Sequence, residues 1–258
     1  MTSSKFIAAL ACAAALGVGA ASAADLGARP YSKAPAYADA LYNWSGFYLG
    51  GHVGGSSTNQ SWTNTARTAL FGDLDPGQGF RQRGTGVFGG GQMGYNWQAG
   101  NYLFGLEGTA SAMDNRGSVL NRTFGAGDDQ FSWRSNWMAT VTGRIGYAVT
   151  NNLFYAKGGY AGVNNQLSVV DANPNPSTGS GSRTQWHNGW TVGAGWEYGL
   201  TQNWIVGLEY DYSAFEAKSY QLAGAGPGVY TFDVKPRDIQ SAVVRLNYKL
   251  GGPGYLSY

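Results

Sequence analysis

Residues 190–212 alternate between two kinds of side chain. In the segment WTVGAGWEYGLTQNWIVGLEYDY, one set of alternate positions is mostly aromatic or aliphatic, and the other consists largely of glycine, threonine and carboxylates. A period of two predicts β-strands, because successive side chains of a strand point to opposite faces. The break at 201–203 is short enough for a hairpin turn. The segment is therefore predicted to form two antiparallel strands with one apolar and one polar face.

The same alternation recurs along the chain and predicts eight strands of about 9–15 residues each, close to the length that a tilted strand needs to cross a membrane. They lie at 44–54, 87–97, 102–110, 135–149, 153–162, 190–198, 204–212 and 239–250. Their connections alternate between short turns and long predicted loops at 55–83, 111–133, 163–186 and about 214–236. This pattern is typical of outer-membrane barrels, in which short turns face the periplasm and long loops face outward. The sequence thus predicts an all-β fold, an eight-stranded antiparallel up-and-down transmembrane β-barrel.

A soluble lipocalin-like barrel also has eight up-and-down strands, but its apolar side chains line the inside. The composition favours the membrane barrel. Charged residues make up 12% of the chain, about half of the roughly 25% usual for a soluble domain, while aromatic residues reach 14%. Beyond the N-terminal segment the chain contains no run of 18 apolar residues, so no transmembrane helix is predicted. The net charge of +2 gives no reason to expect a nucleic-acid partner.

The first residues have the features of an export signal. Lys5 is followed by an apolar run and then by a small-residue cleavage site, which predicts a signal peptide over 1–23. Cys12 is the only cysteine and lies inside that apolar run, so the mature chain is predicted to contain no disulfide. Residues 24–42 are rich in alanine and contain two prolines, which predicts a flexible segment before a barrel over 43–258.

The polar face of the predicted strands carries three acidic and three basic residues, namely Glu107, Arg144, Lys157, Glu197, Glu209 and Arg245. Opposite charges fall on neighbouring strands, which predicts the pairs Glu107–Arg144, Lys157–Glu197 and Glu209–Arg245. Buried charges require partners, and an eight-stranded barrel holds little beyond its own side chains. These six residues are therefore predicted to form a layer of salt bridges that plugs the lumen, with inward glycines making room for it. A gated ion path through the layer is the alternative.

Several motifs together resemble a known family: WSGFYLGGHVGG, GGGQMGYNWQAG, FGLEG, TGRIGYA, LFYAKGGYA, VGAGWEYGLTQNW and RLNYKLGGP. They are similar to the small outer-membrane proteins of alphaproteobacteria, the Brucella-type major outer-membrane and immunogenic proteins, distant relatives of the OmpA-type barrel. The resemblance covers about 43–258. It implies a location in the cell outer membrane, exposed loops that can be antigenic and a porin-family label, and the salt-bridge plug is also a feature of OmpA-type barrels.

The predicted function is that of an integral outer-membrane protein with a structural and surface-interaction role, and a narrow porin-like channel for small solutes or ions is the alternative. The expected partners are outer-membrane lipid and lipopolysaccharide, the outer-membrane assembly machinery and ligands of the loops. Such barrels usually end on an aromatic residue, which the assembly machinery reads. Leu250 occupies that place here, so Tyr248 and Tyr258 are both candidates for the signal.

No enzyme activity, metal or cofactor is expected. The chain has no CxxC or HExxH motif, and the glycine run GTGVFGGG lies on a predicted strand without a following helix to hold a phosphate. Some eight-stranded outer-membrane barrels modify the acyl chains of lipid A, and His187, near Ser182 and Arg183, is the one candidate for such a site. His52 is instead predicted to point into the lumen as a hydrogen-bonded packing residue.

Overall fold

The computed structural model describes residues 42–67, 77–120, 129–171, 181–223 and 229–250. The predicted signal peptide, nearly all of the 24–42 segment and Tyr258 lie outside these ranges. None of the described residues belongs to a helix long and apolar enough to cross a membrane.

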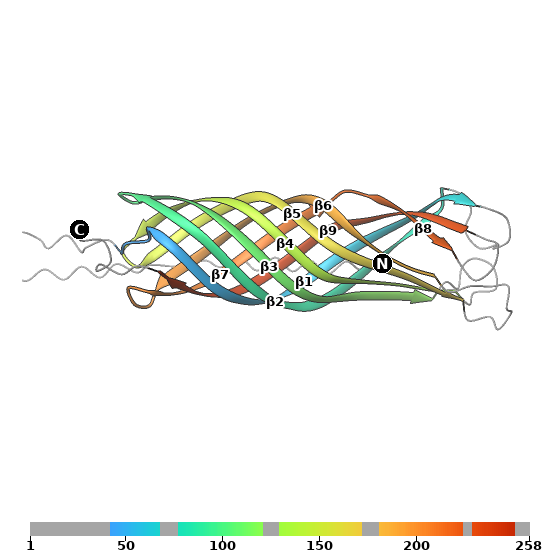
Figure 1. Ribbon diagram of the computed structural model, residues 1–258, viewed down its shortest axis with the longest axis horizontal. Coiled ribbons are helices and arrows are strands. Elements are labelled where there is room, and N and C mark those ends of the chain that lie inside the picture. Colours follow the sequence, from blue (N-terminus) through green and yellow to red (C-terminus); the bar gives the residue numbers. More distant parts are fainter. Residues whose placement is uncertain (1–41, 68–76, 121–128, 172–180, 224–228, 251–258) are drawn as a thin grey trace, which may run out of the picture. The chain divides into compact units, whose positions relative to one another are not determined.

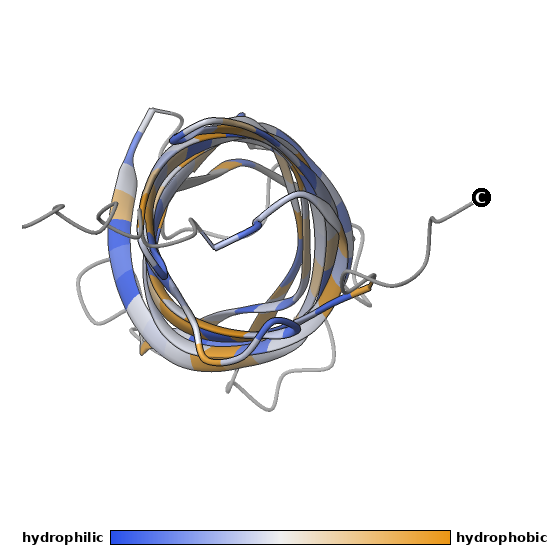
Figure 2. Cartoon of the chain, turned by 90° about the vertical axis from the view of Figure 1, so that its left-hand side faces the viewer, coloured by the Kyte–Doolittle hydropathy of each residue, from blue (hydrophilic) through white to orange (hydrophobic). Residues whose placement is uncertain are grey.

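The described residues form a closed ring of antiparallel strands (Figures 1 and 2). From β1 to β7 each strand pairs with the next along the chain, and β1 closes the ring by pairing with β9. β7 and β8 both pair with β9 and are separated only at 216–217, so together they fill one position in the wall. The predicted eight-stranded up-and-down barrel is therefore confirmed. The strands are β1 Gly46–Arg67, β2 Gly79–Ala99, β3 Tyr102–Leu120, β4 Asp129–Val149, β5 Asn152–Asp171, β6 Gly181–Gly199, β7 Trp204–Phe215, β8 Lys218–Ala223 and β9 Val229–Lys249.

The strands are longer than the sequence predicted. β1, β2, β4 and β9 contain 21 or 22 residues each. At about 3.3 Å per residue they measure about 65–70 Å, whereas about 9–11 residues suffice to cross the hydrocarbon core. Most of each predicted long loop is therefore strand. The predictions failed there because outward positions such as Ser57, Asn59 and Ser61 are polar, which removes the alternation although backbone pairing continues.

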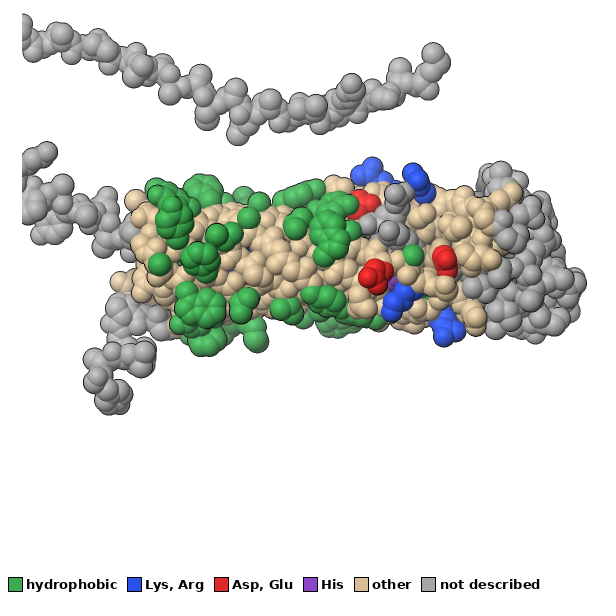
Figure 3. Space-filling view, turned by 90° about the horizontal axis from the view of Figure 1, so that it is seen from above, with side chains coloured by type: hydrophobic (Ala, Val, Ile, Leu, Met, Phe, Trp, Pro, Cys, Tyr) green, Lys and Arg blue, Asp and Glu red, His purple; other side chains and the backbone are tan. Residues whose placement is uncertain are grey.

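Exposed apolar side chains form a belt around the half of the barrel nearer the short turns (Figure 3). The outward faces predicted for the strands are confirmed in this half, and polar and charged side chains follow beyond the belt (Figure 3). The belt includes Phe47, Leu49, Val53, Val87, Met93, Trp97, Tyr102, Phe104, Leu106, Trp137, Val141, Ile145, Tyr147, Phe154, Tyr160, Trp190, Val192, Trp204, Leu208, Tyr210, Val244, Leu246 and Tyr248. We call the end of the barrel with the short turns the turn end and the opposite end the loop end.

The interior is stacked in layers. A turn-end layer of buried apolar residues contains Trp44, Leu103, Ala148, Leu153, Tyr155 and Ile205. The strand positions that follow carry a layer of buried charges. A middle layer contains Met113, Ala161, Val163, Phe215 and Ile239. A loop-end layer, beyond the apolar belt, contains Trp62, Phe131, Trp133, Leu167, Val169, Tyr220 and Val234.

Candidate functional site

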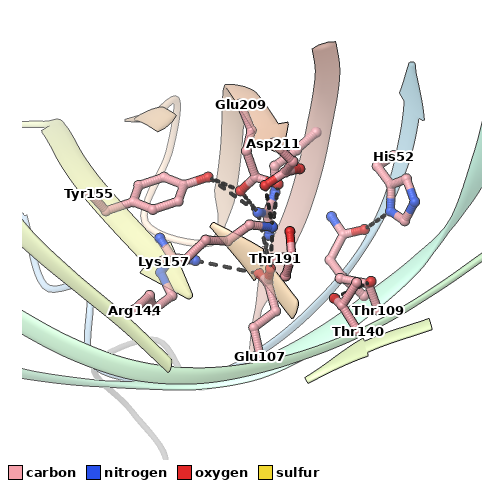
Figure 4. A network of polar contacts seen from close by, with 12 residues as sticks. His52, Glu107, Thr109, Thr140, Arg144, Tyr155, Lys157, Thr191, Glu209 and Asp211 are labelled. Carbon is pink, nitrogen blue, oxygen red and sulfur yellow. Dashed lines mark hydrogen bonds and ion pairs between the residues drawn. The ribbon is translucent and has the colours of Figure 1, made fainter. Parts of the chain in front are cut away.

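The charged layer holds all six of the lumen charges that the sequence singles out. Their side chains point inward and each residue is at most 8% exposed. They come from β3, β4, β5, β6, β7 and β9, so the layer links six of the strand segments across the lumen. Figure 4 shows four of these side chains, those of Glu107, Arg144, Lys157 and Glu209, pointing toward one another. The six residues are Glu107, Arg144, Lys157, Glu197, Glu209 and Arg245.

Arg245 of β9 lies at the centre of the network. Its guanidinium donates to both carboxylate oxygens of Glu107, with one of these distances, Nη1 to Oε1, at 3.1 Å. It also donates to Glu209, and its Nε lies 3.8 Å from Oε1 of Glu197. A guanidinium offers five donors in a planar fork, which allows a single side chain to join three carboxylates.

Arg144 of β4 forms the second junction. Its Nη2 lies 2.6 Å from Oε2 of Glu197, and its Nη1 lies 3.5 Å from Oε2 of Glu107. The guanidinium also lies over the ring of Tyr155, with its carbon 4.1 Å from the ring centroid. The buried cation is thus held by carboxylates on one side and by the π-face of an aromatic ring on the other.

Lys157 of β5 contacts three carboxylates, with its Nζ 2.6 Å from Glu209, 3.2 Å from Asp211 and 3.8 Å from Glu107. The predicted pair Lys157–Glu197 is wrong, since Glu197 pairs with the two arginines instead. The cause is the strand register: Lys157 lies opposite Gly193, whereas Glu197 lies opposite Leu153, four residues nearer the turn. The other two predicted pairs, Glu107–Arg144 and Glu209–Arg245, are present.

Sequence reasoning missed four members of the network: Asp211, Tyr48, Tyr155 and Asn247. The Tyr48 hydroxyl donates to Glu107 over 2.7 Å and accepts from Arg144 over 3.0 Å. Tyr155 donates to Glu209, and Asn247 donates to Glu197 over 3.3 Å. The period of two places all four on the inward face of their strands, so strand parity could have found them. With Asp211 included, four carboxylates face three cations.

Inward glycines provide the space for these side chains. A Cβ atom at position 195 would lie 2.5 Å from the Tyr155 ring, and one at position 94 would lie 2.4 Å from the Tyr48 hydroxyl. At position 105 it would lie 2.9 Å from Cγ of Arg144. The prediction that inward glycines make room for long basic side chains is confirmed at position 105, whereas at positions 94 and 195 the room is taken by tyrosines.

A small cavity of about 40 Å³ lies between the charged layer and the middle layer, lined by residues that include His52, Lys157, Thr191 and Asp211. It has room for about three water molecules. His52 contacts Gln92 over 2.6 Å and Ser111 over 2.8 Å through its two ring nitrogens. The predicted role of His52 as a hydrogen-bonded lumen residue is confirmed.

His187 lies on the inner face of β6 and is fully buried. Its Nδ1 lies 2.9 Å from the carbonyl oxygen of Glu216, and its Nε2 lies 2.6 Å from the hydroxyl of Tyr220. Ser182 and Arg183 are exposed, and Ser182 accepts a hydrogen bond from Gln166. The placement of His187 beside these residues in an acyl-transfer site is therefore wrong, because β6 turns the imidazole into the packed interior.

Comparisons with known proteins agree with this architecture. The family model described as "Outer membrane protein beta-barrel domain" matches residues 8–243. The chain is 31% identical over 217 residues to the 31 kDa outer-membrane immunogenic protein of Brucella melitensis, covering 79% of this chain and 85% of that protein. It is 32% identical over 180 residues to the 22 kDa outer membrane protein of Rhizobium leguminosarum, covering 70% of this chain and 68% of that protein.

Solved structures with a similar arrangement have low sequence identity. Neisserial surface protein A matches 80% of this chain and 98% of its own at 14% identity, with a TM-score of 0.41. The outer membrane protease OmpT of Escherichia coli matches 80% of this chain and 97% of its own at 10% identity, with a TM-score of 0.48.

Proposed function

The chain belongs to the outer membrane protein β-barrel domain family and resides in the outer membrane, and on that premise we propose that its barrel is closed to solutes and acts through its exposed surface. In this proposal the lumen is structural. The charged layer joins the wall of the barrel across its centre, and the long connections and the outer wall of the loop end meet other molecules.

The observation that carries the proposal is the continuous contact network of the charged layer. Arg245 alone joins residues of β3, β6 and β7 to β9, and Lys157 and Arg144 join β5 and β4 to the same carboxylates. Removing one partner of a buried ion pair leaves an uncompensated charge, at a cost of about 3–5 kcal/mol. Opening a path through this layer would separate several such pairs at once, so we expect it to stay closed.

The apolar layers support the same conclusion. A hydrated ion that entered the lumen would meet the turn-end layer on one side of the charges and the middle and loop-end layers on the other. Passing each of them requires the ion to give up water without receiving a polar partner, which is costly. The barrel thus presents barriers of two physical kinds in series.

The outer wall supports a surface role. The strands continue well beyond the apolar belt and present polar side chains there, including Ser57, Asn59, Ser118, Ser132 and Gln166. A wall of this kind lies outside the hydrocarbon and is open to contact with head groups, saccharides or proteins. The signal peptide, the assembly signal and the partners expected at the loops stay predictions.

The test is single-channel conductance of the refolded mature protein in a planar bilayer, with insertion verified by protease protection. We expect no steady openings. Steady openings of the wild-type protein would overturn the proposal and favour the narrow porin-like channel.

A double variant separates the two kinds of barrier. Glu209→Ala together with Arg245→Ala removes an ion pair from the charged layer but leaves the apolar layers intact, so we expect the bilayer to stay silent. Ion flow through this variant, but not through the wild-type protein, would show that the charged layer alone blocks the path. A matched control is Ser132→Ala, which changes the outer wall only.

A further inference from the structure

The outer wall changes its chemistry abruptly at the loop-end border of the apolar belt. On β4 the last outward apolar residue is Trp137, which is 56% exposed, and the next charged residue on the outward face is Arg134. On β3 the outward positions change from Ala112 to Asp114 and Arg116. An aromatic ring at such a border is typical of the level at which lipid head groups meet hydrocarbon. The basic residues therefore begin at head-group level.

Arg116 and Arg134 lie directly opposite each other across β3 and β4. Like charges in this position repel each other and destabilise a sheet. Among the described side chains one carboxylate lies between them: Asp114 is 3.2 Å from Arg116 and 3.1 Å from Arg134. One carboxylate balances one of the two guanidinium charges, so the described side chains leave a positive charge here. The two arginine side chains are also 72% and 55% exposed, which leaves donors free for a further anion.

Arg83 of β2 extends this basic surface. Thr85 lies opposite Arg116, so Arg83, two positions further along the same outward face, is a diagonal neighbour of Arg116. The Arg83 side chain is exposed and donates to Ser57 of β1 over 3.2 Å. Three adjacent strands thus present outward arginines at the same border.

Arg116 and Arg134 line a hollow of about 480 Å³ on the outer wall. Its other lining side chains include hydroxyl and amide groups, those of Ser118, Ser132, Gln166 and Ser168. Guanidinium groups bind phosphate through paired hydrogen bonds, and hydroxyl and amide groups bind its remaining oxygens or an attached sugar. The hollow is therefore suited to a phosphorylated saccharide.

We propose that this hollow binds the phosphate-bearing head group of an outer-leaflet lipid, lipopolysaccharide in particular. The charge of the hollow and its position carry the assignment. An amphiphile whose head group lies on Arg116 and Arg134 can place its acyl chains on Trp137, Val141 and the neighbouring belt. The proposal deepens the surface role proposed above and depends on the long connections facing outward. Its failure is distinguishable from failure of that role, because lipid binding is measured independently of conductance.

The experiment measures binding of purified lipopolysaccharide to the folded mature protein in phosphatidylcholine nanodiscs, with empty nanodiscs as background. The variant Arg116→Gln with Arg134→Gln is expected to weaken binding by about tenfold, because each arginine loses charge-assisted hydrogen bonds. Arg81→Gln is the matched control, since Arg81 is also an exposed residue on the outer face of β2 but does not line the hollow. It is expected to leave binding nearly unchanged.

Two further arms make the test specific. Asp114→Asn is expected to strengthen binding, because it removes the carboxylate that competes with phosphate for both arginines. Lipopolysaccharide stripped of its phosphates is expected to bind the wild-type protein no better than intact lipopolysaccharide binds the double variant. Equal binding by the wild-type protein and the double variant would overturn the proposal. Displacement of lipopolysaccharide by millimolar inorganic phosphate would also overturn it, by assigning the hollow to a free anion.

Discussion

The two halves of this barrel are built with opposite polarity. In the half within the apolar belt, β4 turns Trp137 and Val141 outward and Arg144 inward. In the half beyond the belt, the same strand turns Phe131 and Trp133 inward and Arg134 outward. The backbone of β4 pairs with β3 and β5 on both sides of the change. The medium outside the wall thus decides which face carries the apolar side chains. The outer face carries them where the wall meets lipid, and the inner face carries them where the wall meets water.

On β4 an irregularity in the register accompanies this reversal. Thr140 and Met138 face inward at even positions, whereas Ser135, Trp133 and Phe131 face inward at odd positions. The register with β5 shifts between Ser135 and Trp137, which leaves Asn136 as an extra residue against β5, whereas Met113 and Asp114 of β3 together lie opposite Asn136. One extra residue in a strand exchanges the faces of every residue beyond it. The bulge therefore lets Trp137 meet lipid while Trp133, four residues away, packs in the interior.

The largest expected effect comes from replacing one arginine in each half of the barrel by methionine. Arg245→Met leaves Glu107 and Glu209 buried without their central cation, so we expect the free energy of unfolding to fall by about 3–5 kcal/mol. Arg134→Met removes an exposed side chain, so we expect a change within about 0.5 kcal/mol. Denaturant unfolding in micelles, followed by tryptophan fluorescence, measures both. Similar losses of unfolding free energy for the two variants would contradict a charged interior within the belt and a charged outer wall beyond it.

A second test concerns the aromatic interior of the loop end. Leu167→Ala opens a cavity in the loop-end layer, and we expect it to cost about 2–4 kcal/mol. Gln166→Ala, at the next position of β5, changes the outer wall and is expected to cost less than about 0.5 kcal/mol. Amide hydrogen exchange in the loop-end halves of β4 and β5 shows where in the barrel this stability is lost. If Leu167→Ala left this exchange unchanged, the loop-end layer would not be a packed core.

The reversal of polarity also explains how much of the fold was predictable. Period-two alternation identified every strand within the apolar belt, and strand parity identified the inward charges. The predicted fourth and eighth strands, however, began at 135 and 239, next to register shifts on β4 and β9. Across such a shift, period-two parity places Trp133 on the same face as Trp137, so the sequence pattern no longer describes one continuous strand. On β1 the pattern vanished because both faces are largely polar there.

The candidate site was predictable in its members but not in its pairs. Inward parity selects a side chain, whereas its partner depends on register and on the reach of each side chain. Lys157 and Glu197 lie on adjacent strands, yet four residues of register separate them, and Glu197 pairs with Arg144 instead. The hydroxyls of Tyr48 and Tyr155 were missed because the prediction counted only charged side chains on the inward face.

A smaller effect is expected when a tyrosine hydroxyl is removed, and its size should differ between the charged layer and the loop-end layer. Tyr48→Phe removes a hydroxyl that joins Glu107 to Arg144, both charged, and is expected to cost about 1.5–3 kcal/mol. Tyr220→Phe removes a hydroxyl that contacts His187 and the carbonyl of Asn165, both neutral at pH 7.5, and is expected to cost about 0.5–1.5 kcal/mol. Denaturant unfolding at pH 7.5 measures the difference. A larger loss of unfolding free energy for Tyr220→Phe than for Tyr48→Phe would contradict the stronger hydrogen bonding expected in the charged layer.

The smallest expected effect is a pH dependence confined to the loop end. Burial lowers the pKa of His187 from its ordinary value of 6.5, and the positive charge of nearby Lys218 acts in the same direction. Above pH 6.5 the imidazole is neutral whether this end is folded or open. As the pH falls below 6.5, the open form takes up a proton first, so the folded form loses stability until the pH passes the lowered pKa.

Hydrogen exchange of the β8 amides, corrected for the intrinsic effect of pH, measures this loss. We expect protection of β8 to decrease between pH 7.5 and pH 5, because His187 holds Tyr220 of β8 against β6. His187→Gln has no titrating group at this position, so its β8 protection should change little over the same range. The amides of β3 at 102–110, within the belt, serve as the internal reference. Greater protection of β8 at pH 5 than at pH 7.5 would show that the imidazolium is stabilised in this interior, as the cations of the charged layer are in theirs.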